Sequence, residues 1–343
     1  MKLQNSNSVK MFTDKSTPYP PTNIAFWRAY WITLRPYLFF ISGSAGLLGL
    51  ALTPDAEWAT LLIAFVAFFF SYGLGQAVTD TFQVDTDSIS APYRPLVNNE
   101  ISKFHVLVIS LTGLGVCALV FAFLNPWTLL LCALGVAGLI TYTWFKRRWW
   151  AGPFWNAWIV ALLPAIGFLS AGNSPSAALS SPIIAASMLV TFFSYAIFVL
   201  LGYFKDISAD RQTGYNTLPV AAGWDFSIWI SATIALLAFC TSLWLLSLIE
   251  LPIGSKLMTF AAYGGVLFWL AGVALFFRAH YLMYRIRYKE NEAFKSIGLT
   301  VKGFILIHLG LSVVICPELF LFATFNYALF EWTLHCRPDE KQI

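Results

Sequence analysis

The chain has 343 residues, of which 58% are hydrophobic and only 11% are charged, and its formal net charge is +4. Soluble domains carry about 25% charged residues, so this composition excludes an ordinary water-soluble globular protein and indicates that lipid covers much of the surface. We expect the lipid bilayer as a partner, and no nucleic acid.

The N-terminal segment, residues 1–26, is polar and rich in Ser, Thr, Asn and Pro. It lacks an apolar stretch followed by a small-residue cleavage site, so no cleaved signal peptide is expected. We interpret it as a cytoplasmic segment that precedes a membrane domain over residues 27–330 and a short C-terminal tail over residues 331–343.

Nine apolar stretches predict nine transmembrane helices, because about 20 apolar residues span the hydrocarbon core as a helix. Lipid offers no partners to backbone groups, which leaves helices or closed barrels, and runs such as 61–70 lack the alternation of barrel strands. The expected fold is therefore an all-α integral membrane protein. The predicted spans are 36–53, 58–80, 104–124, 126–144, 153–172, 183–204, 226–248, 258–281 and 304–330.

Lysine and arginine residues gather on one side of these spans. With the N-terminus in the cytoplasm, eighteen basic residues fall on the cytoplasmic side, and only Lys256, Arg337 and Lys341 fall on the other. Because cytoplasmic loops carry an excess of basic residues, the count predicts a cytoplasmic N-terminus. With nine spans it also predicts an external C-terminus.

Acidic residues are sparse but form two clusters. The first ends the second span, and at 3.6 residues per turn its polar residues share one helical face. They are Gln76, Asp80, Gln83 and Asp87. The second cluster ends the sixth span, with Asp206 and Asp210 four residues apart on one face. Charge counting places both loops in the cytoplasm, so the two carboxylate patches meet the same aqueous surface.

Basic residues share that surface. Arg94 follows the first cluster, Lys205 and Arg211 bracket the second, and Lys146 and Arg147 lie on a third loop of the same side. Carboxylates with water suit Mg²⁺, which commonly bridges to phosphate oxygens, and basic side chains suit the remaining phosphate charge. The pattern predicts a diphosphate site at the membrane surface. The alternative is that these charges only end the helices at the interface.

Two stretches carry a resemblance to a known family. Residues 79–102 (TDTFQVDTDSISAPYRPLVNNEIS) resemble the first aspartate-rich motif, NDxxDxxxD followed by Arg-Pro, of the UbiA superfamily of intramembrane prenyltransferases. Residues 202–223 (GYFKDISADRQTGYNTLPVAAG) resemble the second, a DxxxD element followed by an acidic-Arg pair and a Thr-Leu-Pro-Val run. Arg35-Pro36 and the basic loop after Tyr142 are also similar, so the resemblance covers residues 27–330.

The resemblance implies about nine helices around a central cavity and a Mg²⁺-dependent enzyme. Such an enzyme transfers a prenyl group from an isoprenyl diphosphate to a small lipophilic or aromatic acceptor, through carbocation-like ionisation. A UbiA-type terpene cyclase, which needs no external acceptor, is the alternative. A non-enzymatic alternative is a transporter or a structural membrane protein. Transporters usually place charges at the membrane midplane and contain internal repeats, whereas the acidic clusters here lie at one surface.

The resemblance implies that Asp80, Asp87, Asp206 and Asp210 are catalytic and hold the metal. The predicted substrate-binding residues are Gln76, Gln83, Arg94, Lys146, Arg147, Asn156, Tyr203, Lys205 and Arg211. Two departures matter: Thr79 stands where the family has Asn, and Gln83 stands where it has the middle Asp. We expect the first site to hold metal more weakly, or to use Asp85 in compensation.

Tyr72 and Tyr203 lie on the motif-bearing helices and are candidates to stabilise a carbocation with their rings. Glu318, near the middle of the ninth predicted span, is either functional or a protonated, hydrogen-bonded core residue, and His308 is interpreted as a core histidine. We expect an integral, multi-pass protein of the inner or plasma membrane if bacterial, or of an organelle or endoplasmic reticulum membrane if eukaryotic.

Overall fold

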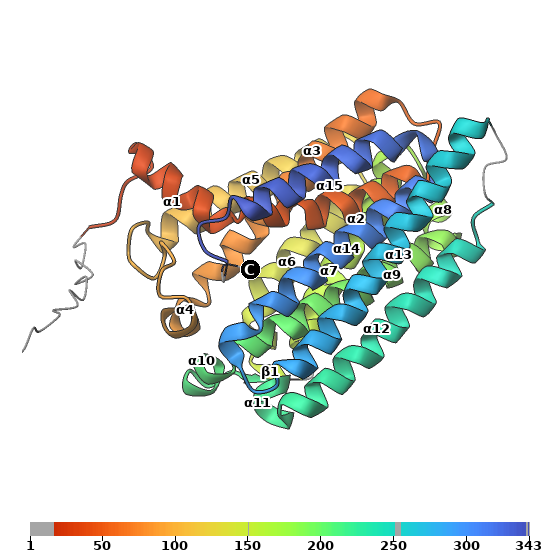
Figure 1. Ribbon diagram of the computed structural model, residues 1–343. Helices are drawn as coiled ribbons and strands as arrows, with labels where there is room; N and C mark the ends of the chain where they lie inside the picture. The colour runs from red at the N-terminus through yellow and green to blue at the C-terminus, as the bar shows by residue number, and fades with distance from the viewer. Residues whose placement is uncertain (1–16, 150, 251–254, 341, 343) are drawn as a thin grey trace, which may run out of the picture.

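The computed structural model describes residues 17–149, 151–250, 255–340 and 342. Long helices run side by side through the bundle, and most short elements gather at one end, whereas the short helix α8 (Pro175–Ser180) lies at the other (Figure 1). This arrangement confirms the predicted all-α class. The long helices are α1 (Ile24–Leu34), α2 (Phe39–Ala51), α3 (Trp58–Thr81), α5 (Lys103–Leu124), α6 (Thr128–Lys146), α7 (Gly152–Ser170), α9 (Pro182–Gly202), α12 (Trp224–Ser247), α13 (Lys256–Arg285), α14 (Phe294–Ile315) and α15 (Phe320–His335).

Nine helical segments within the described residues are long and apolar enough to cross a membrane, which confirms the predicted number. All nine predicted spans overlap these segments, as 58–80 overlaps Trp58–Thr81, although the ninth, 304–330, shares only residues 304–315 with its segment. The first segment covers Ile24–Ala51, because only the turn η1 (Pro36–Leu38) separates α1 from α2. The cytoplasmic location of the N-terminus stays a prediction.

The ninth predicted span, 304–330, is wrong in its boundaries. Helix α14 begins at Phe294, ten residues earlier, and ends at Ile315, and the turn η4 (Pro317–Leu319) leads into α15. Pro317 has no backbone N–H and disfavours helix in the residue before it, so it divides an apolar run that hydropathy reads as continuous. Glu318 consequently lies exposed in a turn and not in the middle of a span.

Helix α15 runs back along α14, as the ion pair between Lys302 and Glu331 requires (Figure 1). It returns the chain to the neighbourhood of η1, where Gln342 donates to the Ile32 carbonyl and accepts from the Tyr37 hydroxyl. The predicted placement of the C-terminal tail on the opposite side from the N-terminal segment is therefore wrong for the described tail. Helix α15, which hydropathy does not separate from α14, reverses the direction of the chain.

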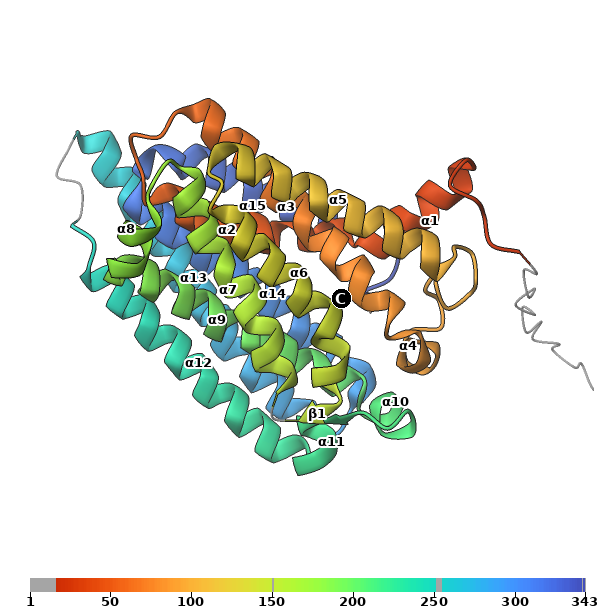
Figure 2. The same cartoon turned by 180° about the vertical axis from the view of Figure 1, so that it is seen from behind.

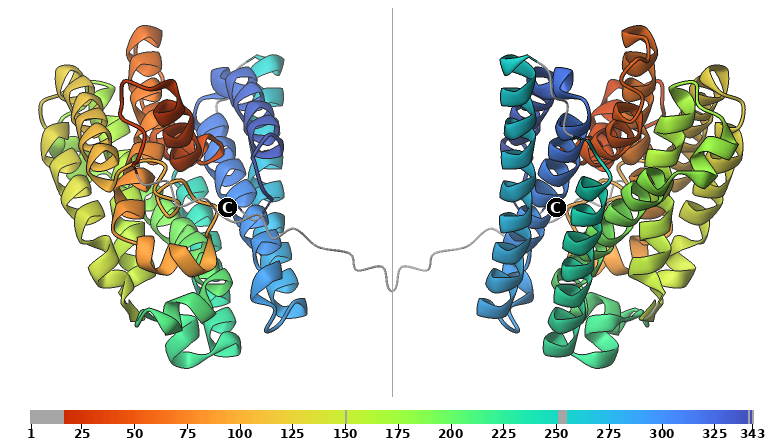
Figure 3. Two further views of the ribbon diagram at one scale, coloured as in Figure 1. Left: turned by 90° about the vertical axis from the view of Figure 1, so that its left-hand side faces the viewer. Right: turned by 90° about the vertical axis from the view of Figure 1, so that its right-hand side faces the viewer.

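The centre of the bundle is formed by α2, whose thirteen residues are all buried. It packs against α3, α7 and α14, while α5, α6, α12 and α13 lie at the periphery (Figure 3). Close approach requires glycine at two positions of α2: a Cβ at Gly46 would overlap the Phe68 ring, and a Cβ at Gly49 would overlap the Pro164 carbonyl. Small residues let helices approach closely when lipid provides no hydrophobic driving force between them.

One end of the bundle, which we call the motif end, carries the short elements α4 (Val84–Ser90), α10 (Ile207–Gln212) and α11 (Leu218–Ala222) (Figure 2). Two short strands, β1 (Arg148–Trp149) and β2 (Asn216–Thr217), pair there in parallel. The pairing joins the basic loop after α6 to the second acidic motif. Both motifs therefore meet at one end, as the parity of the predicted spans required.

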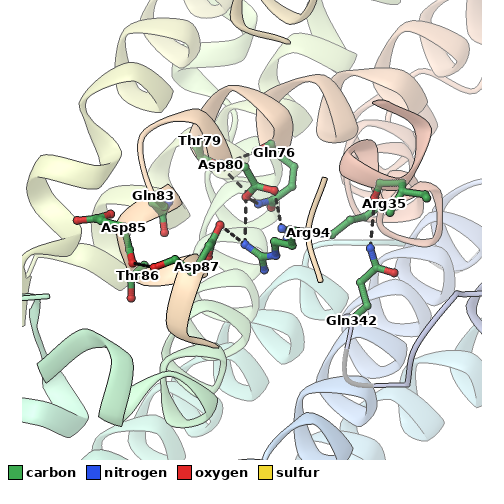
Figure 4. A network of polar contacts seen from close by, with 12 residues as sticks. Arg35, Gln76, Thr79, Asp80, Gln83, Asp85, Thr86, Asp87, Arg94 and Gln342 are labelled. Atoms are coloured by element: carbon green, nitrogen blue, oxygen red, sulfur yellow. Dashed lines mark hydrogen bonds and ion pairs between the residues drawn. The ribbon is translucent and has the colours of Figure 1, made fainter. Parts of the chain in front are cut away.

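The first motif does not lie on one continuous helix, so the predicted common face of positions 76, 80, 83 and 87 is wrong. Helix α3 ends at Thr81, and α4 begins at Val84. Phe82 and Gln83 form the break between them. Asp80 therefore ends one helix and Asp87 belongs to the next, and the two carboxylates approach each other from different elements (Figure 4).

Candidate active site

Two adjoining cavities lie between the helices near the motif end. The first is polar, and the second is apolar and enclosed by α3, α5, α6 and α7; each has a volume of about 110 Å³. Residues that line both cavities are Tyr72, Gln76, Thr79, Asn156 and Tyr195. The molecule thus has the predicted central cavity, divided into a polar chamber and an apolar chamber that share one wall.

Asp80 is held by three side chains (Figure 4). Its Oδ2 lies 2.6 Å from Arg35 Nη2, and its Oδ1 accepts from Gln76 Nε2 at 2.7 Å and lies 3.8 Å from Arg94 Nη1. Arg35, which the sequence analysis did not include among the site residues, occupies the break before η1 with a positive φ of 52°. The Arg35-Pro36 pair was the signal that pointed to it.

Asp87 forms a buried ion pair with Arg94 (Figure 4). Burial raises the pKa of Asp87, and Arg94 opposes that rise. Burial also lowers the pKa of Arg94, but the Asp87 and Asp80 carboxylates outweigh this effect, so the pKa of the guanidinium lies above its ordinary value. One guanidinium therefore links both carboxylates of the first motif.

Lys146 connects the two motifs. Its Nζ donates to Gln83 Oε1 at 2.9 Å and lies 3.7 Å from Asp210 Oδ1. Asp210 is fully buried and also accepts from the hydroxyls of Thr86 at 3.2 Å and Thr217 at 3.1 Å. Burial raises the pKa of Asp210, and Lys146 counteracts it. Strand β2 and helix α4 thus supply the neutral partners of this carboxylate.

The remaining predicted residues are divided between the cavity and the surface. Asp206, Asn156, Tyr203 and Lys205 line the polar cavity. Arg211 is exposed and lines neither cavity. The cavity therefore brings Asp206, Asn156, Tyr203 and Lys205 together but not Arg211, and the roles of all five remain predictions.

Arg147 and Asp85 pair with each other at the surface, 3.1 Å apart, with 42% and 45% of their side chains exposed. The guanidinium lies over the Tyr215 ring, whose hydroxyl donates to Asp85 at 3.2 Å. Asp85 therefore belongs to this surface cluster. Its position argues against the expectation that Asp85 replaces the metal-binding carboxylate missing at position 83.

Four tyrosines line the polar cavity in two hydroxyl pairs. Tyr72 and Tyr195 are 3.0 Å apart between their hydroxyl oxygens, and Tyr142 and Tyr203 are 3.1 Å apart. Tyr72 and Tyr203 were predicted candidates, whereas Tyr195 was not singled out. His308 is buried away from the cavities and bonds Thr191 and the Phe304 carbonyl, as expected of a core histidine.

The oxygen-rich residues of this site fit Mg²⁺, although no three carboxylates among the described residues stand close enough to form a ready-made metal cage. Mg²⁺ usually keeps several waters and binds through one or two carboxylates together with substrate phosphates. Asp206 lines the cavity and forms no ion pair within 4 Å among the described residues. A metal bridging from such a carboxylate to a diphosphate is consistent with this arrangement.

Comparison with known proteins gives concordant results. The model of the UbiA prenyltransferase family matches residues 38–300. Digeranylgeranylglyceryl phosphate synthase from Thermococcus sibiricus is 28% identical over 247 residues, which is 69% of this chain and 83% of that protein. Chloroplastic chlorophyll synthase from Arabidopsis thaliana is 27% identical over 169 residues, 46% of this chain and 42% of that protein.

Solved structures share the fold. A UbiA homolog from Aeropyrum pernix K1 in its apo form aligns with a TM-score of 0.66 at 18% identity, covering 80% of this chain and 96% of that one. A UbiA homolog from Archaeoglobus fulgidus bound to DMAPP and Mg²⁺ aligns with a TM-score of 0.59 at 16% identity, covering 81% and 98%. Since the family match extends over most of the residues, the chain belongs to the UbiA prenyltransferase family and is a multi-pass integral membrane prenyltransferase.

Proposed function

We propose that the enzyme transfers a prenyl group from an isoprenyl diphosphate to a lipophilic or aromatic acceptor in a Mg²⁺-dependent reaction. The observation that carries the proposal is the shared wall between the polar and apolar cavities, lined by Tyr72, Gln76, Thr79, Asn156 and Tyr195. An amphiphile with a charged head and a hydrocarbon chain fits such a pair of chambers, because each end meets an environment of its own polarity.

The diphosphate would lie in the polar cavity, where Arg35, Lys146 and Lys205 line the wall. Positioned cations stabilise charge that develops on a leaving group, and they do so more strongly in a buried site than in water. Mg²⁺, held by predicted aspartates that include Asp206 and Asp210, would add Lewis-acid stabilisation of the same oxygens. The Archaeoglobus homolog with DMAPP and Mg²⁺ supports this assignment.

Ionisation would break the bond between C1 of the prenyl chain and the diphosphate oxygen, and the bonding electrons leave with the diphosphate. The tyrosine rings at the cavity junction offer electron-rich faces to the resulting cation. The apolar chamber is lined mainly by aliphatic side chains of α5, α6 and α7. Such a lining would disfavour water, which would otherwise capture the cation. The acceptor then forms a bond to C1 and releases a proton.

The acceptor that we propose is a lipophilic or aromatic molecule. The relatives named digeranylgeranylglyceryl phosphate synthase and chlorophyll synthase yield chemically different products. A panel of acceptors should therefore contain a glyceryl phosphate lipid, a chlorophyll precursor, phenols and quinones.

The test is an assay of the purified enzyme with Mg²⁺ and geranyl, farnesyl or geranylgeranyl diphosphate. Diphosphate release and organic products are measured with and without the acceptor panel. We expect release that depends on an acceptor and is lost in the Asp206→Ala/Asp210→Ala variant. Asp225→Ala, which removes an exposed carboxylate outside the cavities, is the matched control and should retain activity.

The other outcomes are equally informative. A cyclic hydrocarbon or terpene alcohol formed without acceptor, and lost in the double variant, would establish the terpene cyclase alternative. No diphosphate release with any chain length or acceptor would contradict both functions.

A further inference from the structure

We propose that this enzyme binds Mg²⁺ only on the side of the second motif, at Asp206 and Asp210, and that the Lys146 ammonium group takes the place of a metal on the side of the first motif. The inference deepens the proposed function and rests on it, because it assumes that the polar cavity receives a diphosphate. It starts from the two positions at which the first motif departs from its family pattern.

At both departures the side chain is neutral and already engaged, and at position 83 it replaces a charged carboxylate of the family pattern. Gln83 Oε1 accepts from Lys146 Nζ at 2.9 Å, so the amide oxygen is turned toward a cation. The Thr79 hydroxyl donates to the Gln76 carbonyl at 2.9 Å, one turn earlier in α3. Neither position offers the charged oxygen on which Mg²⁺ binding largely depends.

The two buried carboxylates of the first motif are each paired with an arginine. Asp80 has Arg35 on one oxygen and Gln76 on the other, and Asp87 pairs with Arg94. Only 4% of the Asp80 side chain and 8% of the Asp87 side chain are exposed. A metal entering here would have to displace a guanidinium and leave that charge buried without its partner, which is costly.

Asp85 does not fill the gap, because Arg147 and the Tyr215 hydroxyl hold it at the surface. On this side of the cavity, Arg35 and Lys146 line the wall, and each carboxylate of the first motif already has a basic partner. A diphosphate would meet positive charge on this side without a metal.

The second motif offers the opposite arrangement. Asp206 faces the polar cavity, and Asp210 follows it after one turn, at the spacing that places two side chains on one helical face. The contacts of Asp210 are hydroxyl groups and a long 3.7 Å approach to Lys146. Neutral hydroxyls and an ammonium 3.7 Å away leave the oxygens of Asp210 more available to a divalent cation than the short arginine pairs leave those of the first motif.

Lys146 stands between the two motifs and is itself almost fully buried, with 5% of its side chain exposed. Its charge faces a neutral amide on one side and a carboxylate on the other. A carboxylate at position 83 would bind a metal ion, and that ion would carry the positive charge. In this protein the Lys146 ammonium carries a positive charge at the same place.

The experiment counts bound metal directly. The purified enzyme is saturated with an inert thiol analogue of geranyl diphosphate, and Mn²⁺ binding is followed by electron paramagnetic resonance of the free ion. We expect one Mn²⁺ per chain in the wild type. Asp206→Asn should weaken Mn²⁺ binding at least about tenfold, whereas the matched Asp87→Asn variant should still bind one Mn²⁺.

A swap of the two groups tests the role of Lys146. The Gln83→Asp/Lys146→Met variant introduces the carboxylate and removes the ammonium, and we expect it to bind a second Mn²⁺. Thermal unfolding and elution volume, compared with the wild type, establish that each variant is folded.

Two Mn²⁺ in the wild type, loss of Mn²⁺ in Asp87→Asn, or a single Mn²⁺ in the swap variant would overturn the inference and leave the proposed function intact. Failure of the wild type to bind the analogue at any Mn²⁺ concentration would instead overturn the proposed function, and the inference with it.

Discussion

Arg35 and Asp80 form a buried ion pair, with Nη2 and Oδ2 separated by 2.6 Å and less than a tenth of either side chain exposed. The pair joins the break between α1 and η1 to the end of α3, two segments that are far apart in the sequence. It fixes the first motif in position before any substrate binds.

Removing one partner of this pair should destabilise the protein strongly. We expect Arg35→Met to lower stability by about 3 kcal/mol, because buried Asp80 would lose its short ion pair and keep only Gln76 and the 3.8 Å approach of Arg94. The double variant Arg35→Met/Asp80→Asn should recover part of that loss. Thermal unfolding in detergent measures both, and Arg287→Ala, which breaks an exposed pair with Asp225, is the control expected to have little effect. Equal melting temperatures for Arg35→Met and wild type would contradict the assignment.

Lys146 should be essential for ionisation of the diphosphate. We expect Lys146→Met to lower kcat by about 10²–10³-fold, the magnitude seen when a positioned stabiliser of developing charge is removed. Steady-state measurement of diphosphate release tests this. A change confined to KM, with kcat preserved, would indicate that Lys146 only binds the ground state.

The apolar chamber should select the length of the prenyl chain. Gly135 lines this chamber, and its nearest neighbour across the space is Ile159 at 3.9 Å from an added Cβ, so a side chain fits there. We expect Gly135→Leu to raise KM for the longest accepted isoprenyl diphosphate at least about tenfold, while shorter substrates are less affected. Gly115→Leu on α5, where nothing lies within 4 Å, is the matched control. An identical chain-length profile in both variants would exclude this chamber as the chain-binding site.

The α13–α14 pair should depend on its glycines. A Cβ at Gly272 would lie 2.8 Å from the Gly303 carbonyl oxygen, and a Cβ at Gly265 would lie 2.8 Å from the Gly310 carbonyl oxygen. We expect Gly272→Ala to cost about 1–3 kcal/mol through overpacking, seen as a lower melting temperature. Gly115→Ala, which points into open space, should not change it.

Much of the architecture could be predicted because the bilayer imposes a simple rule. A helix must offer about 20 apolar residues to cross it, so composition alone shows the protein to be a helical membrane protein, and the spacing of apolar runs counts its spans. The parity of spans then brings Asp80 and Asp206 to one end of the bundle. The i, i+4 spacing of the second motif also indicates Asp210, and the basic loop after the fourth span indicates Lys146.

Other features depended on tertiary contacts that hydropathy does not encode. The turn at Pro317 divides one apolar run into α14 and α15, and the break at Phe82 and Gln83 divides the first motif between two helices. The partner of each charged group was likewise undetermined: Asp85 is drawn to Arg147, whereas Gln83 receives Lys146.

The sequence by itself therefore determined the membrane fold, the number of spans and the residue types of the site, because apolar length and motif spacing are local properties. Only the tertiary structure decided that Arg35 forms an ion pair with Asp80 and that two chambers share a wall at Tyr72 and Tyr195. It also decided which carboxylates face the cavity. These depend on distances between segments separated by tens to hundreds of residues, which the packing of helices sets.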